Sequence, residues 1–171
     1  MQKREGGGNI MRIRDYDRTL AVGYARKWAL GRNPAYYDFD PIGGDCTNFI
    51  SQCLFAGAGQ MNFTPVFGWY YLSLDNRAPA WTGVEYLHNF LVGNRAEGPF
   101  ALETGVEKLE RGDVIQLGSE SGNFYHSLLV TEIQPEILVC AHTFDALDKP
   151  LAEYYYDRAR FLHVEGVRKN G

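Results

Sequence analysis

Cys46 is the residue whose type and position best suit nucleophilic chemistry. Gly43, Gly44 and Asp45 lead into it, as the end of a turn would. The residues after it carry an apolar stripe at steps of three and four residues, typical of an amphipathic helix: Phe49, Ile50, Cys53 and Leu54. A thiol on the first turn of a helix lies near unpaired N–H groups and the positive end of the helix dipole. We therefore expect Cys46 to ionise more readily than a thiol in water and to act as a nucleophile.

A nucleophilic thiol needs a base, and two of the four histidines fall on runs that favour strands. His126 begins one such run and His142 ends the next, with Gln134-Pro135 breaking the chain between them. A hairpin centred at Gln134 places Leu128 opposite Cys140 and His126 opposite His142. A bulge would shift this register by one residue and leave the two imidazoles diagonal or on opposite faces.

These parts would suffice for nucleophilic acyl transfer. Cys46 would attack the carbonyl carbon, His126 would take and return the proton, and His142 would fix the tautomer and orientation of His126. Asp145 is the alternative orienting residue, because it lies just beyond the expected strand. The backbone N–H of Cys46, unpaired at a helix start, could form half of an oxyanion hole.

Other uses of these residue types rank lower. A zinc site built from Cys46, His126 and His142 is chemically feasible, but no C-x-x-C or H-x-x-x-H motif anchors it. We therefore expect neither a metal nor an organic cofactor. The remaining members of the two residue types are interpreted as structural or surface residues: Cys53, Cys140, His88 and His163.

Composition restricts the class of protein. The chain has 171 residues, of which 45% are hydrophobic and 14% aromatic, enough for one well-packed core. Its net charge of -4 argues against a nucleic-acid partner. No apolar run reaches the roughly 20 residues of a membrane helix, and the start of the chain lacks the apolar core of a signal peptide. Three cysteines, an odd number, argue against a disulfide framework.

The chain divides into a leader and a single domain. Residues 1–13 contain Gly6-Gly7-Gly8 and are interpreted as a flexible leader, and residues 14–171 as one domain. Helices are expected from Asp15 to about Gly31, from Cys46 to between Gly57 and Gly59, and over residues 82–93, where Thr82-Gly83-Val84-Glu85 has capping-box spacing. Strands are expected over 113–117, 125–133, 137–143 and 161–167. Helices followed by antiparallel strands indicate an α+β domain.

An aromatic, irregular segment over residues 61–81 separates the second and third expected helices. Trp69, Tyr70, Tyr71 and Trp81 are interleaved there with polar and turn residues. The segment suits either the wall of a substrate groove or a small satellite core beneath a long loop. The pattern does not choose between these two alternatives.

Four blocks of the sequence resemble a known family: Asp45–Gln52, Arg111–Gln116, Tyr125–Thr131 and Ala141–Asp145. Together, over roughly residues 15–168, they resemble the bacterial putative amidase domain family, which is similar to NlpC-type and CHAP-type papain-like cysteine peptidases. The resemblance implies a papain-like fold in which the nucleophilic cysteine begins a helix packed on a small antiparallel sheet.

The resemblance also assigns roles to individual residues. It implies that Cys46 is the nucleophile, His126 the base and His142 the third, polar member. Thr47-Asn48 stands where the NlpC-type relatives often have Ser-Gly. Tyr37 is the candidate second partner of the oxyanion.

The expected activity is hydrolysis of an amide or peptide bond through a thioester acyl-enzyme. By resemblance, the substrate class is a bacterial cell-wall peptide or a related amide, and the location would be the cell wall or the exterior if the domain belongs to a longer exported protein. Two alternatives stay open: an acyltransferase that uses the same triad, and a catalytically silent module that binds peptide or glycan in the same cleft.

Overall fold

The computed structural model describes residues 10–170. Within these residues there are four α-helices and three short 3-10 helices, most of them in the first half of the chain and the others between strands. Their bounds are α1 Arg18–Trp28, η1 Asp40–Ile42, α2 Cys46–Ala58, α3 Pro79–Thr82, α4 Val84–Gly93, η2 Val106–Lys108 and η3 Leu151–Glu153.

Nine strands complete the fold. They are β1 Met11–Arg14, β2 Tyr71–Ser73, β3 Asn76–Arg77, β4 Gly98–Thr104, β5 Val114–Gly118, β6 Phe124–Glu132, β7 Leu138–Ala141, β8 Ala146–Pro150 and β9 Arg158–Asn170. Seven of them form one sheet in the order β1-β9-β5-β6-β7-β8, with β4 paired to β9, and β2 and β3 form a separate hairpin. All these pairings are antiparallel, so the α+β prediction is confirmed.

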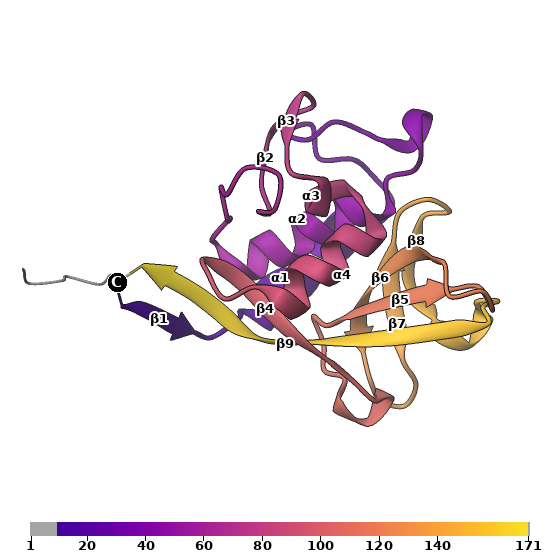
Figure 1. Cartoon of the computed structure of the whole chain (residues 1–171). Helices are drawn as coiled ribbons and strands as arrows, with labels where there is room; N and C mark the ends of the chain where they lie inside the picture. Colours follow the sequence, from indigo (N-terminus) through magenta and orange to yellow (C-terminus); the bar gives the residue numbers. More distant parts are fainter. Residues whose placement is uncertain (1–9, 171) are drawn as a thin grey trace, which may run out of the picture.

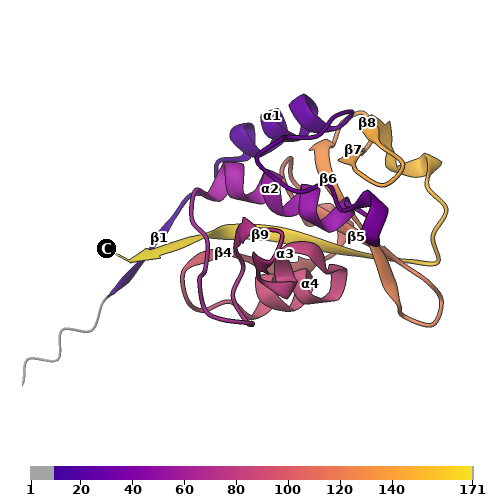
Figure 2. The same cartoon turned by 90° about the horizontal axis from the view of Figure 1, so that it is seen from above.

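The helices gather on one side of the sheet, and the long strand β9 connects the two ends of the molecule (Figure 1). Seen from above, α1 and α2 lie next to each other over the sheet (Figure 2). Helix α2 begins, at Cys46, at its end nearer β5. Among residues 10–170, no helix has the length and apolar character needed to cross a bilayer.

Two apolar cores lie on opposite faces of strands β5 to β7. The larger core joins the helices to strand residues such as Val114, Leu129 and Cys140. The smaller core contains the alternate residues of the same strands, including Ile115 and Leu128. This alternation follows from the pleat, since successive side chains of a strand point to opposite faces.

Local sequence signals explain where the first two helices begin and end. The Asp17 side chain accepts a hydrogen bond from the N–H of Leu20 and caps α1. Gly59 ends α2 in the left-handed conformation, with φ of 63°. Helix α1 buries small residues, including Ala21 and Ala25, whereas Leu20 is exposed.

Three other expectations need correction. The predicted leader is wrong for residues 11–13, which belong to β1 and pair with β9, whereas residues 1–9 lie outside the described part of the chain. No side chain caps α4, whose N-cap is Gly83, so the predicted capping box does not form. Trp69 and Trp81 are fully buried in the larger core, so they are neither a groove wall nor a satellite core.

Candidate active site

Cys46 is the first residue of α2, as predicted. It is half-buried, whereas Cys53 and Cys140 are fully buried. The turn before it depends on two glycines: Gly43 and Gly44 have φ of 122° and 107°, and a Cβ on Gly44 would lie 3.1 Å from Oγ1 of Thr143. Of the three cysteines, Cys46 is therefore the one that a solute can reach.

The Cys46 thiol lies against strand β6. The backbone N–H of Ser127 and the side chain of Thr47, whose Oγ1 lies 3.7 Å from Sγ, both interact with the sulfur. The hydroxyl of Thr47 also meets that of Ser127 at 3.1 Å. These contacts fix the start of α2 on β6, one residue along the chain from His126.

Burial raises the pKa of the Cys46 thiol above its ordinary value, and the hydrogen bonds from Ser127 and Thr47 oppose that shift only in part. The prediction that the helix terminus makes this thiol easier to ionise than a thiol in water is therefore wrong. The position of Cys46 at the start of the helix was predicted correctly. Removal of the thiol from water, however, raises its pKa by more than its hydrogen bonds lower it. The thiol is neutral at neutral pH.

Asp45 and His142 form a buried pair behind the thiol. Nδ1 of His142 lies 2.5 Å from Oδ2 of Asp45, and each residue is 1% exposed. The other ring nitrogen of His142, Nε2, lies 2.8 Å from the carbonyl oxygen of Trp28, and the ring stacks on Phe49 at 3.9 Å. Both nitrogens of His142 thus have partners within the helical layer.

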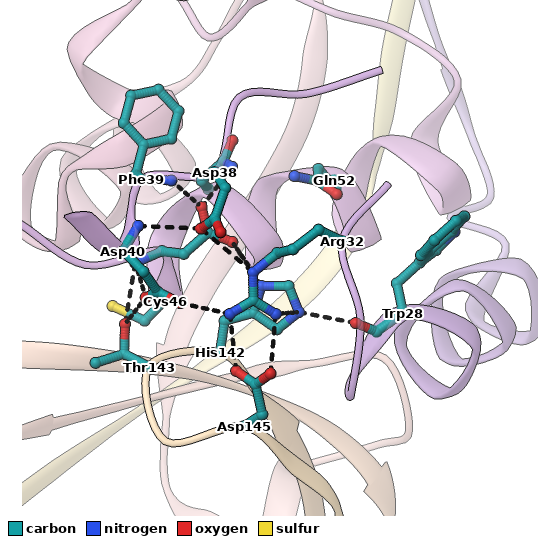
Figure 3. Close-up of polar contacts among 12 residues, drawn as sticks. Trp28, Arg32, Asp38, Phe39, Asp40, Cys46, Gln52, His142, Thr143 and Asp145 are labelled. Carbon is teal, nitrogen blue, oxygen red and sulfur yellow. Dashed lines mark hydrogen bonds and ion pairs between the residues drawn. The ribbon is translucent and has the colours of Figure 1, made fainter. Parts of the chain in front are cut away.

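Arg32 closes this polar cluster toward solvent (Figure 3). Its guanidinium binds both carboxylate oxygens of Asp145, at 2.9 and 3.0 Å, and Asp40 at 2.5 Å. It also lies 3.2 Å from Nε2 of His142. In the view of Figure 3 the Cys46 sulfur points away from the His142 ring. The cluster holds the loop before α2 to the turn after β7.

His126 and His142 do not face each other. Leu129 pairs with Cys140, one residue away from the predicted Leu128–Cys140 pair, so the register is the shifted one. Alternation then places the two imidazoles on opposite faces, with His142 toward the helices. The prediction that His142 orients His126 is therefore wrong.

His126 projects to the face of the smaller core. Its ring centroid lies 6.2 Å from that of Tyr154, which packs against this core. Burial, and then the positive charge of Lys149, lower the pKa of His126 to about 4. A β-bulge at the Leu117–Gly118 step interrupts the pairing beside it. His126 is thus a half-buried, neutral imidazole near the start of β6, beside the bulge.

The two remaining predicted residues lie elsewhere. Asp145 binds Arg32 rather than His126, so its predicted role as the alternative orienting residue is wrong as well. The N–H of Tyr37 donates to the hydroxyl of Tyr71 at 2.8 Å, and the Tyr37 carbonyl accepts from Nδ2 of Asn48. Its role toward the oxyanion stays a prediction.

Four contributors to the site were missed: Asp45, Arg32, Ser127 and Tyr154. Asp45 could have been predicted from the sequence, because it is an acidic residue directly before the candidate nucleophile Cys46. The other three carry no spacing signal, because each reaches the site through a contact between distant segments. Within residues 10–170, no group of three His, Cys, Asp or Glu side chains is arranged to hold a metal ion.

Comparison with known proteins identifies the family. Residues 15–164 match the model of the putative amidase domain. The chain belongs to the putative amidase domain family. Membership of this family indicates an amidase-like hydrolase. No solved structure matches the chain.

A curated relative extends the comparison to a whole protein. It is a protein of Bacillus subtilis (strain 168) named "Uncharacterized protein YhbB", 35% identical over 150 residues. These residues make up 85% of this chain and 46% of the relative. The chain thus spans about half the length of the curated relative it matches.

Proposed function

We propose that this domain is a cysteine amidase with a papain-like fold, in which Cys46 is the nucleophile and His126 the base. The observation that carries the proposal is the position of the Cys46 sulfur. Cys46 is the half-buried first residue of α2, and its sulfur lies against the backbone N–H of Ser127, the residue that follows His126 in β6. Family membership supplies the reaction class, and this thiol supplies a nucleophile for it.

The resting pair is a neutral thiol and a neutral imidazole, since burial raises the pKa of Cys46 and lowers that of His126. As the sulfur attacks the carbonyl carbon, its proton passes to His126. The imidazolium then protonates the departing amine as the C–N bond breaks and a thioester forms. The same imidazole then takes a proton from water as the water attacks the thioester. The imidazolium gives this proton to the departing sulfur, which restores the thiol and releases the acid.

No hydrogen bond joins Cys46 and His126 within residues 10–170, and His126 projects to the face of the smaller core, so its side chain must turn from that face toward the sulfur. Such a change of rotamer is common, because catalytic hydrogen bonds often tighten only when substrate is bound. The side chain of His126 makes no hydrogen bond to any of residues 10–170 that would hold it back.

The first turn of α2 supports an oxyanion site. The Asp45 side chain makes no capping hydrogen bond. Its carboxylate instead binds His142, the N–H of Phe39 and Nδ2 of Asn48. The N–H of Cys46 at the helix start is therefore free of a side-chain cap and suits a developing oxyanion.

We propose a cell-wall peptide or a related amide as the substrate class. Support for this comes from the resemblance of the sequence blocks to NlpC-type and CHAP-type enzymes. Transfer of the acyl group to an amine in place of water would use the same two residues and differ only in the acceptor.

The test combines labelling with turnover. Iodoacetamide labelling of each cysteine, read by peptide mass spectrometry, should modify Cys46 first. Hydrolysis of a panel of peptide amides and cell-wall peptides should be lost in Cys46→Ala and retained in Cys53→Ala, which removes a buried thiol. Hydrolysis that survives in folded Cys46→Ala would overturn the proposal.

A further inference from the structure

Tyr154 carries a hydroxyl that lacks a partner. The residue follows η3, and its ring lies 6.2 Å from that of His126, inclined by 39°. The oxygen is buried, yet it makes no hydrogen bond to any of residues 10–170. Buried hydroxyl groups are nearly always satisfied, so this one calls for a partner in the working state of the protein.

The Tyr154 ring also contacts Lys149. The ammonium of Lys149 lies 4.4 Å from the ring centroid, a cation–π distance. Lys149 is fixed in turn by β8, where it pairs with Val139 of β7. The phenol is thus a supported group beside an imidazole whose own nitrogens have no hydrogen-bond partner among the described residues.

We propose that Tyr154 is the positioning residue for His126: its hydroxyl accepts the N–H of one ring nitrogen and leaves the other free to receive the Cys46 proton. This inference rests on the proposed function. It assigns to Tyr154 the role that the sequence had suggested for His142, from the face of the sheet to which His126 projects. The two ring centroids lie 6.2 Å apart, and Tyr154 packs against the smaller core, the face to which His126 projects.

The surroundings of His126 suit this arrangement electrostatically. The charge that acts on His126 is that of Lys149 in β8, and the ring beside it is that of Tyr154. Glu153 at η3 acts on Tyr154. Burial, with Cys140 and Glu153 adding to it, raises the pKa of Tyr154 to about 12. The phenol is therefore protonated at neutral pH and does not act as a base in place of His126.

The test uses Tyr154→Phe, which keeps the ring and removes the oxygen. The matched control is Tyr155→Phe, because the Tyr155 side chain is 97% exposed. We expect Tyr154→Phe to lower kcat about 10-fold or more with KM little changed, and Tyr155→Phe to leave both unchanged.

A second measurement does not depend on activity. Nitrogen-15 NMR of the imidazoles should show His126 as one neutral tautomer in the unmodified protein and as a mixture in Tyr154→Phe. Unchanged kcat together with an unchanged tautomer would overturn the inference and leave Tyr154 as a packing residue. A tautomer mixed in the unmodified protein would overturn it too, even if Tyr154→Phe did not fold.

The two proposals can fail separately. If Cys46→Ala retains hydrolysis while Tyr154→Phe still changes the His126 tautomer, the proposed function is wrong and the pairing of the two rings stands. If Cys46→Ala is inactive and Tyr154→Phe changes neither kcat nor tautomer, the nucleophile stands and Tyr154 has no positioning role.

Discussion

The two histidines predicted to cooperate occupy opposite kinds of environment. His142 is 1% exposed, with both ring nitrogens bonded and its ring stacked on Phe49. His126 is half-buried, makes no side-chain hydrogen bond within residues 10–170, and has its pKa lowered to about 4. A satisfied imidazole stabilises a fold, whereas an unsatisfied one retains the capacity to move a proton. The comparison supports a structural role for His142 and is one reason to propose His126 as the base.

The largest expected effect is on activity at His126. His126→Ala should lower kcat about 10²- to 10⁴-fold, since that is the usual contribution of a general base. Its melting temperature should change little, because the side chain makes no hydrogen bond to the described residues. Turnover and thermal unfolding measured on the same preparation would check both. Equal activity in His126→Ala and the unmodified protein would remove His126 from the mechanism.

The opposite result is expected at His142. His142→Ala removes the imidazole from Oδ2 of the buried Asp45 carboxylate, whose other oxygen keeps the N–H of Phe39 and Nδ2 of Asn48, and should lower the free energy of unfolding by about 3 kcal/mol. Urea denaturation would measure this loss. His142→Gln, which offers an amide donor, should recover part of it. A variant that is fully stable but inactive would reverse the assignment and make His142 the reactive imidazole.

The pH dependence of kcat/KM would sharpen the comparison. His126 must be unprotonated to act, so activity should fall as the pH drops through about 4, where His126 becomes charged. Burial raises the thiol pKa, so the alkaline limb should lie above the ordinary value for cysteine. We expect a broad plateau between these limbs. A narrow bell with its alkaline limb below pH 8 would indicate a preformed thiolate–imidazolium pair instead.

The smallest effect is expected at Asp145. Asp145→Asn weakens an exposed ion pair with Arg32 and should cost about 1 kcal/mol of stability or less. Its kcat should match that of the unmodified protein, because Asp145 contacts Arg32 and not His126. The matched control is Asp38→Asn, which weakens another exposed pair with the same arginine. A large fall in kcat for Asp145→Asn alone would return Asp145 to the catalytic group.

Local sequence signals determined much of the fold. The apolar stripe after Asp45 and the glycines beyond it predicted α2, with Cys46 as its first residue. The runs of β-branched and aromatic residues predicted β5, β6, β7 and β9. These features depend on residues near one another in the chain, so periodicity and capping chemistry suffice to find them. The family blocks followed from the same stretches.

The tertiary structure decided which side chains lie next to the two histidines. A shift of one residue between β6 and β7 turned His142 toward Asp45 and His126 toward Tyr154, and no local pattern records such a shift. Burial, which depends on the whole fold, then set the direction of both pKa changes, against the expectation from the helix dipole at Cys46. The sequence thus singled out Cys46, His126 and His142 as candidate reactive groups. The packing of the sheet determined which of them meet, because register and desolvation are properties of contacts between distant segments.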